Sequence, residues 1–321
     1  MLILLRAAKG VEMRTLNFIS NTTTERDERG NVSLVKMPHR ALPSSFHMFM
    51  ANDFHVGNSE TSEHAIEQFI HAVKSKKNSY VYLQGDQLEC INISDPRFDL
   101  DVHSGRGPRV NVMRDAFMEL LEPIADRVIL ILDGNHERRL RNLFQPNLDI
   151  AKAWNTVYAN GTLAKLIFPG FRICAWHGSG FIGSYAGDQK QRHVNEQIAL
   201  KRKLRRLPAQ DCEVITCGHY HRLILSEPDP RLLLVTDQER NQLVSDYTRP
   251  SRIWLDQERG LYRVPEEERY YVCTGSFLRG YSEDMPSYVE DMGLEATELG
   301  YGHIEVKNDK LLKVETVKVT P

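Results

Sequence analysis

The sequence predicts a protein of the α/β class, and three observations lead to that prediction. Five apolar stretches of strand length each end in polar side chains. Longer segments between them place apolar residues at the spacing of an amphipathic helix. The 321 residues are enough for one large α/β core. We expect a single domain at residues 43–321, because the polar strand ends are spread from Asp53 to His221 with no linker rich in Pro, Gly or Ser.

The most informative stretch begins at Val128, where five apolar residues run into Asp133, Gly134, Asn135 and His136. A β-branched apolar run that ends at a glycine turn is typical of a strand covered on both faces of its sheet. Open α/β sheets carry their sites at the carboxyl ends of their strands. We therefore expect a buried strand that ends at functional side chains.

Four other apolar runs follow the same pattern, and each ends in residues with carboxylate or imidazole side chains. They are Phe46–His55, with Asp53 and His55; Tyr80–Glu89, with Asp86; Phe171–Gly178, with His177; and Val214–His221, with His219 and His221. If these strands are parallel neighbours, their side chains converge on one edge of the sheet. Carboxylates and imidazoles gathered in this way predict a metal site.

Three segments between these runs are predicted helices. Ser59–Lys77 carries an apolar face, with Ser and Thr residues before it and lysines at its end. A second helix has an apolar stripe from Met113 to Ile124, and a third runs from Gln189 to Leu207. The resulting βαβαβ order, with right-handed crossovers, would put the first three strand ends side by side.

The two ends of the chain follow other patterns. We interpret residues 1–42 as a variable, turn-rich lead-in that includes part of a hairpin, and Met13 as an alternative start. Gly302–Val319 predicts a hairpin that turns at Asn308-Asp309. After His221 the pattern changes to short strands, and we expect this C-terminal half to form a second sheet that packs on the first. These strands are Arg231–Thr236, Ile253–Leu255, Leu261–Val264 and Tyr270–Thr274.

Composition excludes several classes of protein. With 41 basic and 43 acidic residues the net charge is −2, so any affinity for a polyanion must be local. The five cysteines form no Cys-x-x-Cys pair, which indicates a reduced, cytoplasmic protein. No apolar run reaches the roughly 18 residues of a membrane-spanning helix, and Leu2–Leu5 is too short for the core of a signal segment.

Taken in order, five motifs resemble those of the calcineurin-like metallophosphoesterase family. Each motif alone is weak, since a lone Gly-His-x-His is more often a turn than a pair of ligands. All five in this order, each ending an apolar run, carry the resemblance over roughly Phe46–Arg222. They are Asp53-x-His55, Gly85-Asp86-x-x-Glu89, Gly134-Asn135-His136-Glu137, His177 and Gly218-His219-x-His221. Thr274-Gly275-Ser276-Phe277, Ser287-Tyr288 and Leu299-Gly300-Tyr301 are similar to the tail of phage and prophage members.

The resemblance implies a four-layer α/β/β/α sandwich with two mixed β-sheets and a pair of divalent metal ions. The chemistry agrees, because imidazoles and carboxylates bind borderline metals and a shared carboxylate keeps two ions about 3.5–4 Å apart. We expect manganese first, ahead of iron, zinc, nickel or magnesium. By the resemblance, Asp53, His55 and His221 would hold the first ion, Asn135, His177 and His219 the second, and Asp86 would bridge them.

The activity that the resemblance implies is hydrolysis of a phosphoric ester. Two bound ions lower the pKa of a water molecule towards about 7, which prepares it for in-line attack on phosphorus. The family assigns the position of His136 as general acid for the leaving group, and Glu89 is a candidate to orient its ring. Arg138 and Asn135 are candidates for binding the substrate phosphate, because a guanidinium fork matches phosphate oxygens.

Several alternatives stay open at this point. Glu89 reads equally well as a plain surface carboxylate, and most of the arginines after His136 are expected on a solvated helix face. The substrate is a phosphomonoester, a nucleotide or nucleic acid, and no membrane partner is expected; the sequence predicts no oligomeric state. The basic segment Lys201–Arg206 and the loop Pro96–Arg109, with Arg97, Arg106 and Arg109, would suit a nuclease, although basic runs on helices are usually solvated.

A second class of protein is a non-catalytic binding scaffold on the same fold. Such a protein would be expected to have lost ligands, whereas every motif position is present in this sequence. The sequence therefore favours a metal-dependent enzyme.

Overall fold

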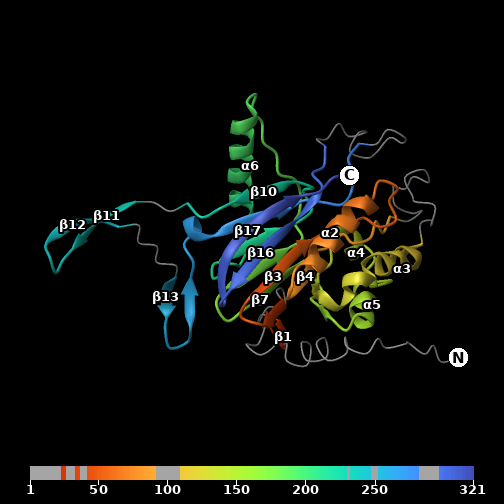
Figure 1. Cartoon of the computed structure of the whole chain (residues 1–321), viewed down its shortest axis with the longest axis horizontal. Helices are drawn as coiled ribbons and strands as arrows, with labels where there is room; N and C mark the ends of the chain where they lie inside the picture. Colours follow the sequence, from red (N-terminus) through yellow and green to blue (C-terminus); the bar gives the residue numbers. More distant parts are fainter. Residues whose placement is uncertain are drawn as a thin grey trace.

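The computed structural model describes residues 23–26, 33–36, 42–91, 109–229, 232–246, 252–281 and 296–321. Two large mixed β-sheets form its centre (Figure 1). The six-stranded sheet has the order β17-β16-β3-β4-β5-β6, with β3 (Phe46–Ala51), β4 (Ser79–Leu83), β5 (Val128–Ile131), β6 (Val157–Tyr158), β16 (Gly300–Lys307) and β17 (Lys310–Lys318). The seven-stranded sheet has the order β1-β2-β7-β8-β9-β15-β10, with β1 (Thr23–Arg26), β2 (Ser33–Lys36), β7 (Leu163–Ile167), β8 (Arg172–Trp176), β9 (Val214–Cys217), β10 (Leu223–Ser226) and β15 (Tyr270–Thr274).

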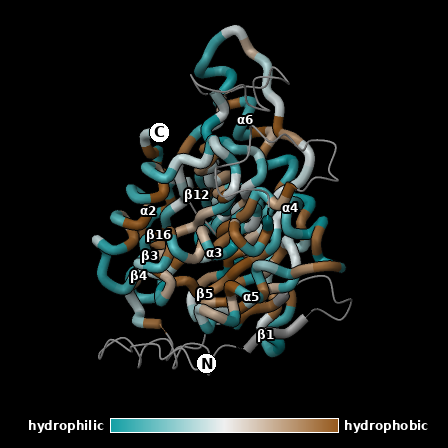
Figure 2. Tube along the Cα trace, turned by 90° about the vertical axis from the view of Figure 1, so that its right-hand side faces the viewer, coloured by the Kyte–Doolittle hydropathy of each residue, from teal (hydrophilic) through white to brown (hydrophobic). Residues whose placement is uncertain are grey.

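Three buried clusters of apolar side chains divide the molecule into four layers. One lies between the six-stranded sheet and the helices α2 (Glu63–Ser75), α3 (Val110–Leu121) and α5 (Pro146–Ala153). The second fills the space between the two sheets, and the third packs α6 (Gln189–Leu204) on the outer face of the seven-stranded sheet. Figure 2 shows apolar stretches gathered among the strands and the helices α3 and α5. The predicted four-layer α/β/β/α sandwich is confirmed.

The first half of the chain follows the predicted βαβαβ order. β3, β4 and β5 are parallel neighbours, and α2 and α3 connect them. α2 begins where the Ser62 side chain accepts a hydrogen bond from the Ala65 backbone N–H, and its apolar face, which includes Phe69, is buried. α3 continues into the short 3-10 helix η1 (Glu122–Arg127) before β5 begins. The carboxyl ends of these three strands therefore lie at one edge of their sheet.

The arrangement of the remaining strands differs from the prediction in two respects. β8 and β9 belong to the seven-stranded sheet and are not neighbours of β3, β4 and β5. The C-terminal hairpin β16–β17 does turn at Asn308-Asp309, but it joins the first sheet, where β16 pairs antiparallel with β3. Burial explains the second difference, because Ile304 and Val306 are buried and a strand of this kind gains most beside the otherwise open edge of β3.

Of the four short strands predicted after His221, only β15 joins the seven-stranded sheet, where it lies between β9 and β10. The others form two separate ribbons, β11 (Leu233–Asp237) with β12 (Gln242–Asp246) and β13 (Ile253–Asp256) with β14 (Leu261–Arg263). Both ribbons extend from the body of the molecule (Figure 1). Leu234 and Leu243 are exposed there, so a strand pattern alone did not distinguish core strands from an exposed ribbon.

The described parts of the lead-in contribute to the seven-stranded sheet. β1 pairs antiparallel with β2, and β2 pairs parallel with β7. The division of the chain near residue 42 stays a prediction. Met13, Arg97, Arg106 and Ser287-Tyr288 lie outside the described residues. The five cysteines are free and buried. Among the described residues, no helix combines the length and the apolar character needed to cross a membrane.

Candidate metal centre

The loops after five strands meet between the two sheets. β3, β4 and β5 contribute Asp53, His55, Asp86 and Asn135, while β8 and β9 contribute His177, His219 and His221. The sequence predicted convergence on the edge of one sheet; the structure places the site where the edges of two sheets face each other. Stacked sheets lie about 10 Å apart, so side chains from both can reach a common centre.

The backbone at this edge takes a conformation that side chains disfavour. Five of the proposed ligands have positive φ angles: 51° at Asp53, 50° at His55, 51° at Asp86, 70° at His219 and 51° at His221. A non-glycine residue in the left-handed region costs of order 1 kcal/mol, and residues held in this way cluster at functional sites. The fold therefore holds these side chains in place against local preference.

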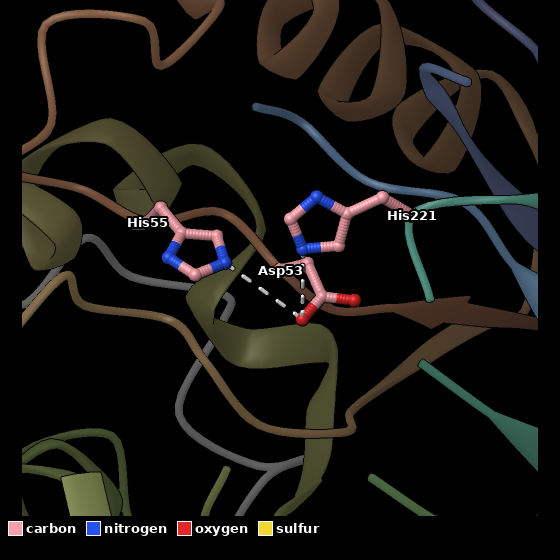
Figure 3. A group of neighbouring side chains, drawn as sticks. All are labelled: Asp53, His55 and His221. Carbon is pink, nitrogen blue, oxygen red and sulfur yellow. Dashed lines mark ion pairs between the residues drawn. The ribbon is translucent and has the colours of Figure 1, made fainter. Parts of the chain in front are cut away.

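The first group of possible ligands is Asp53, His55 and His221 (Figure 3). Both rings point at the same oxygen, with Asp53 Oδ1 at 3.9 Å from His55 Nε2 and 3.8 Å from His221 Nε2. Asp53 Oδ1 and His55 Nε2 are buried and make no hydrogen bond. Buried polar atoms without a partner are rare in folded proteins, and two that face each other fit a cation between them.

The second group is Asp86, His177 and His219. His177 Nε2 lies 3.2 Å from Asp86 Oδ2 and 3.0 Å from Asn135 Oδ1. The same Asp86 Oδ2 lies 4.0 Å from His55 Nε2 in the first group. One carboxylate oxygen therefore faces both groups, as a bridging ligand requires.

Hydrogen bonds behind the rings fix which nitrogen faces the centre. His55 Nδ1 pairs with the Glu89 carboxylate at 2.9 Å, and His177 Nδ1 donates to the Gln84 backbone carbonyl at 2.9 Å. Partners of this kind fix the tautomer of a metal-binding histidine and orient its ring. Both Nε2 atoms therefore face the other proposed ligands.

His136 lies beside this centre, with its backbone N–H donating to Asp86 Oδ1 at 2.9 Å. The structure divides the role expected of Glu89. Its carboxylate holds His55, whereas its backbone carbonyl accepts the hydrogen bond from His136 Nδ1. His55, Glu89 and His136 also form a third group that could hold a cation. Glu89 is buried, so it is not the plain surface carboxylate of the alternative interpretation.

Sequence reasoning missed two residues that support the centre. The buried Glu137 carboxylate accepts hydrogen bonds from the backbone N–H groups of Asp86, Leu88 and Gly134, at 3.1, 3.0 and 2.8 Å, and so ties the loop after β4 to the loop after β5. An acidic residue three positions after a helix start is a capping signal that could have identified it. Asn52 donates to the Asp53 carboxylate and to the Gly275 carbonyl, and no sequence signal pointed to it.

Burial and neighbouring charges shift the pKa values of the site residues in opposite directions. Burial lowers the pKa of His55 and His177, but the carboxylates around them outweigh burial and raise each pKa to about 9. Burial raises the pKa of Asp53 to about 6. Burial also raises the pKa of Asp86, but the neighbouring His177, His136 and His55 together outweigh burial and hold that pKa well below its usual range. Burial and the neighbouring His177 lower the pKa of His219 to about 4. The carboxylates therefore favour the protonated form of His55 and His177, whereas burial favours the neutral form of His219.

Of the basic candidates, Arg138 lies beside this centre. Arg138 is exposed on the short helix α4 (Asn135–Arg138) and lines a cavity that also touches Asn135 and His177. Arg109 is exposed at the start of α3. Arg202, Arg205 and Arg206 are exposed at the end of α6, a solvated helix face in this structure.

Neither a protein-family model nor a curated protein matches the sequence. Solved structures give distant likenesses. Vacuolar protein sorting 29 from Cryptosporidium parvum is 12% identical, with a TM-score of 0.39 over 87% of this chain and 100% of that chain. The nuclease MPE of Pseudomonas putida is 9% identical, with a TM-score of 0.31 over 91% and 98%. The NAD nucleotidase of Haemophilus influenzae is 12% identical, with a TM-score of 0.31 over 85% and 49%. The likeness is too distant to carry an activity.

Proposed function

We propose that this protein is a metal-dependent phosphoesterase that hydrolyses its substrate with a water molecule activated by a pair of divalent ions. One observation carries the proposal. Asp86 Oδ2 faces two groups of carboxylate and imidazole side chains, all buried except the half-buried His219 and His221. In the first group, Asp53 Oδ1 and His55 Nε2 have no hydrogen-bond partner.

The residues present fit a dinuclear centre. Asp53, His55 and His221 would hold one ion, and Asn135, His177 and His219 the other, with Asp86 shared between them. Mixed imidazole and carboxylate ligands suit borderline divalent metals, and manganese stays our first choice. When bound, the two ions would supply a Lewis acid for the phosphoryl oxygens and lower the pKa of a water molecule towards about 7.

His136 would give a proton to the leaving group. Its Nδ1 faces the Glu89 carbonyl, an acceptor only, so Nδ1 carries a hydrogen and Nε2 is the nitrogen that can transfer a proton. Nε2 lies 4.0 Å from Asp86 Oδ2, at the border of the proposed metal centre. The ring is buried, which shields the proton transfer from bulk water. Asn135 and Arg138 would bind the phosphoryl oxygens, with Arg138 reaching in from the rim.

Removal and restoration of metal test the proposal. We expect metal-depleted protein to hydrolyse p-nitrophenyl phosphate only after manganese is added back. Asp86→Asn should lose most activity and much of the bound metal, since one carboxylate serves both groups. Asp126→Asn, an exposed acid on η1, is the matched control and should retain both. Full activity in the presence of a strong chelator would show that the hydrolysis needs no metal. Fewer than about one ion per chain, with no hydrolysis of any aryl phosphate, would instead favour the binding scaffold.

One observation favours a nuclease as the second candidate. Lys203 Nζ lies 5.5 Å from the ring centre of Tyr220, the residue between His219 and His221, so the basic end of α6 reaches the border of the metal centre. α6 also stands out from the sandwich (Figure 1). Replacing Lys201, Arg202, Arg205 and Arg206 with Gln should weaken DNA binding and reduce its salt dependence by roughly one unit for each lost phosphate contact. Hydrolysis of a small aryl ester should change little. Equal effects on both, or on neither, would argue against a nucleic-acid surface.

We also propose that the chain is similar to the phage and prophage members of the metallophosphoesterase family. Ser276 and Leu299, from two of the tail motifs that carry it, form an isolated β-bridge. Ser276 also donates a hydrogen bond to the Asp53 carbonyl at 3.0 Å, so this segment supports the loop of a proposed ligand.

A further inference from the structure

A cavity of about 460 Å³ opens directly beside the candidate metal centre. Its inner wall includes Asn135 and His177, two of the proposed ligands. Small-molecule sites commonly have volumes of about 300–1,000 Å³, so the space is of the right size for a group larger than a phosphoryl group. A substrate whose phosphorus lies at the metal centre would place one of its substituents here.

One side of the cavity is cationic. Arg138 and Arg139 line it from the end of α4, and both side chains are exposed. Guanidinium groups pair with phosphate oxygens in a fork geometry and also stack on planar rings. This side therefore favours an anionic substrate that carries a planar group.

The lining also includes an aromatic side chain. Trp176, the last residue of β8, lines the cavity and is half-buried, and it packs against the apolar cluster on the outer face of the seven-stranded sheet. Its carbonyl accepts a hydrogen bond from the Gln84 side chain at 3.2 Å, and the Gln84 carbonyl in turn holds His177 Nδ1. The backbone at Trp176 is thereby linked through Gln84 to a proposed metal ligand.

We propose that this cavity binds the nucleoside of the substrate, with the base against Trp176 and the phosphoryl oxygens near Arg138 and Asn135. This inference rests on the proposed phosphoesterase function and names its substrate class: a phosphoester of a nucleoside. Bases stack on tryptophan whatever their hydrogen-bonding pattern, so the cavity accepts nucleotidyl groups with little preference among bases. A simple alkyl phosphate leaves the aromatic side of the cavity without a partner.

Two diesters with the same leaving group test the inference. Methyl p-nitrophenyl phosphate and thymidine 5′-(p-nitrophenyl phosphate) both release nitrophenolate, so they differ only in the group offered to the cavity. We expect the wild-type kcat/KM to favour the thymidine ester by about 10-fold or more, the scale of one stacked base. Trp176→Leu should reduce that preference to near unity, through KM and not kcat, and Trp176→Phe should restore much of it. Trp254→Leu, an exposed tryptophan on β13, is the matched control and should leave the preference unchanged.

Equilibrium binding to the manganese-loaded protein gives a readout that does not need turnover. Thymidine 5′-monophosphate should bind about 10-fold more tightly than methyl phosphate, and Trp176→Leu should remove the difference. If a thymidine decanucleotide binds more tightly than thymidine 5′-monophosphate, the nucleoside in the cavity belongs to a polynucleotide substrate. If the two bind equally, the substrate is a free nucleotide. No preference for the nucleotide in wild-type protein, or a preference that survives Trp176→Leu, would overturn the inference. If nucleotides bind but neither ester is hydrolysed, the proposed function fails and the cavity assignment stands.

Discussion

Gly134→Ala would perturb the proposed bridging carboxylate without replacing any proposed ligand. A Cβ atom at Gly134 would lie 2.0 Å from Asp86 Oδ1 and 2.3 Å from the Asp86 backbone nitrogen. Such contacts essentially never occur below 3.0 Å. To restore a separation of 3.0 Å, the Asp86 carboxylate must move by about 1 Å or more relative to the loop that carries Asn135 and His136.

A displacement of about 1 Å at a reacting centre typically costs about 10²-fold in rate. We expect Gly134→Ala to lose at least that factor in kcat/KM for p-nitrophenyl phosphate and to bind less manganese at saturation. Elemental analysis of the purified variant measures the metal, and a thermal melt establishes that the chain is folded. Gly187→Ala is the matched control, since a Cβ there meets no atom within 4 Å. A folded Gly134→Ala with wild-type metal content and turnover within twofold would refute the reasoning.

Three further predictions follow from the same site. His136→Ala should keep its metals and slow hydrolysis of an ester with an alkoxide leaving group by about 10² to 10⁴-fold. The rate for a nitrophenyl ester should fall much less, because nitrophenolate needs no proton to leave. Equal rate losses for the two esters, together with lost metal, would make His136 a ligand. Glu89→Ala should weaken manganese affinity in a binding titration by about 10 to 100-fold, because His55 loses its hydrogen-bond partner. The leaving-group dependence should stay intact, because the hydrogen bond of His136 goes to the backbone carbonyl of residue 89, while the carboxylate lies 3.9 Å away. Loss of that dependence would return the orienting role to the carboxylate. Since the pKa values of His55 and His177 are raised to about 9 in the metal-free protein, binding of manganese at pH 7 should release protons, and the affinity for manganese should rise with pH towards 9. Calorimetry in buffers of different ionisation enthalpy measures the released protons, and metal binding without proton release would contradict the prediction.

Local patterns predicted most of the sandwich. Apolar β-branched runs and helical spacing located the strands β3, β4, β5, β8 and β9 and the helices α2, α3 and α6, because these elements bury one continuous face. Sheet membership was another matter. The hairpin β16–β17 was found, but no local signal showed that it closes the edge of β3 from more than 200 positions away in the chain. Exposed ribbons such as β11–β12 carry the same alternation as core strands, and only tertiary packing separates the two.

The candidate site was also predictable only in part. The order of the motifs identified the carboxylates and imidazoles, since those residue types are recognisable by their chemistry. The contacts of the supporting residues were not recognisable, although Glu89 was a candidate by its motif and Glu137 stands at a capping position. Glu137 acts through three backbone N–H groups, Asn52 through contacts with Asp53 and Gly275, and Glu89 through a carboxylate and a carbonyl that serve different histidines. Contacts to backbone atoms leave no residue-type signature in a partner segment, so only the fold reveals them.

The number of metal ions bound per chain tests the central claim most directly. Metal-depleted protein would be dialysed to equilibrium against manganese at pH 8 and its metal content measured together with its protein concentration. The arrangement of two ligand groups around Asp86 predicts about two ions per chain, falling to about one or fewer in Asp86→Asn. A wild-type content that saturates below one ion, or an Asp86→Asn variant that still binds two, would contradict the assignment of this centre.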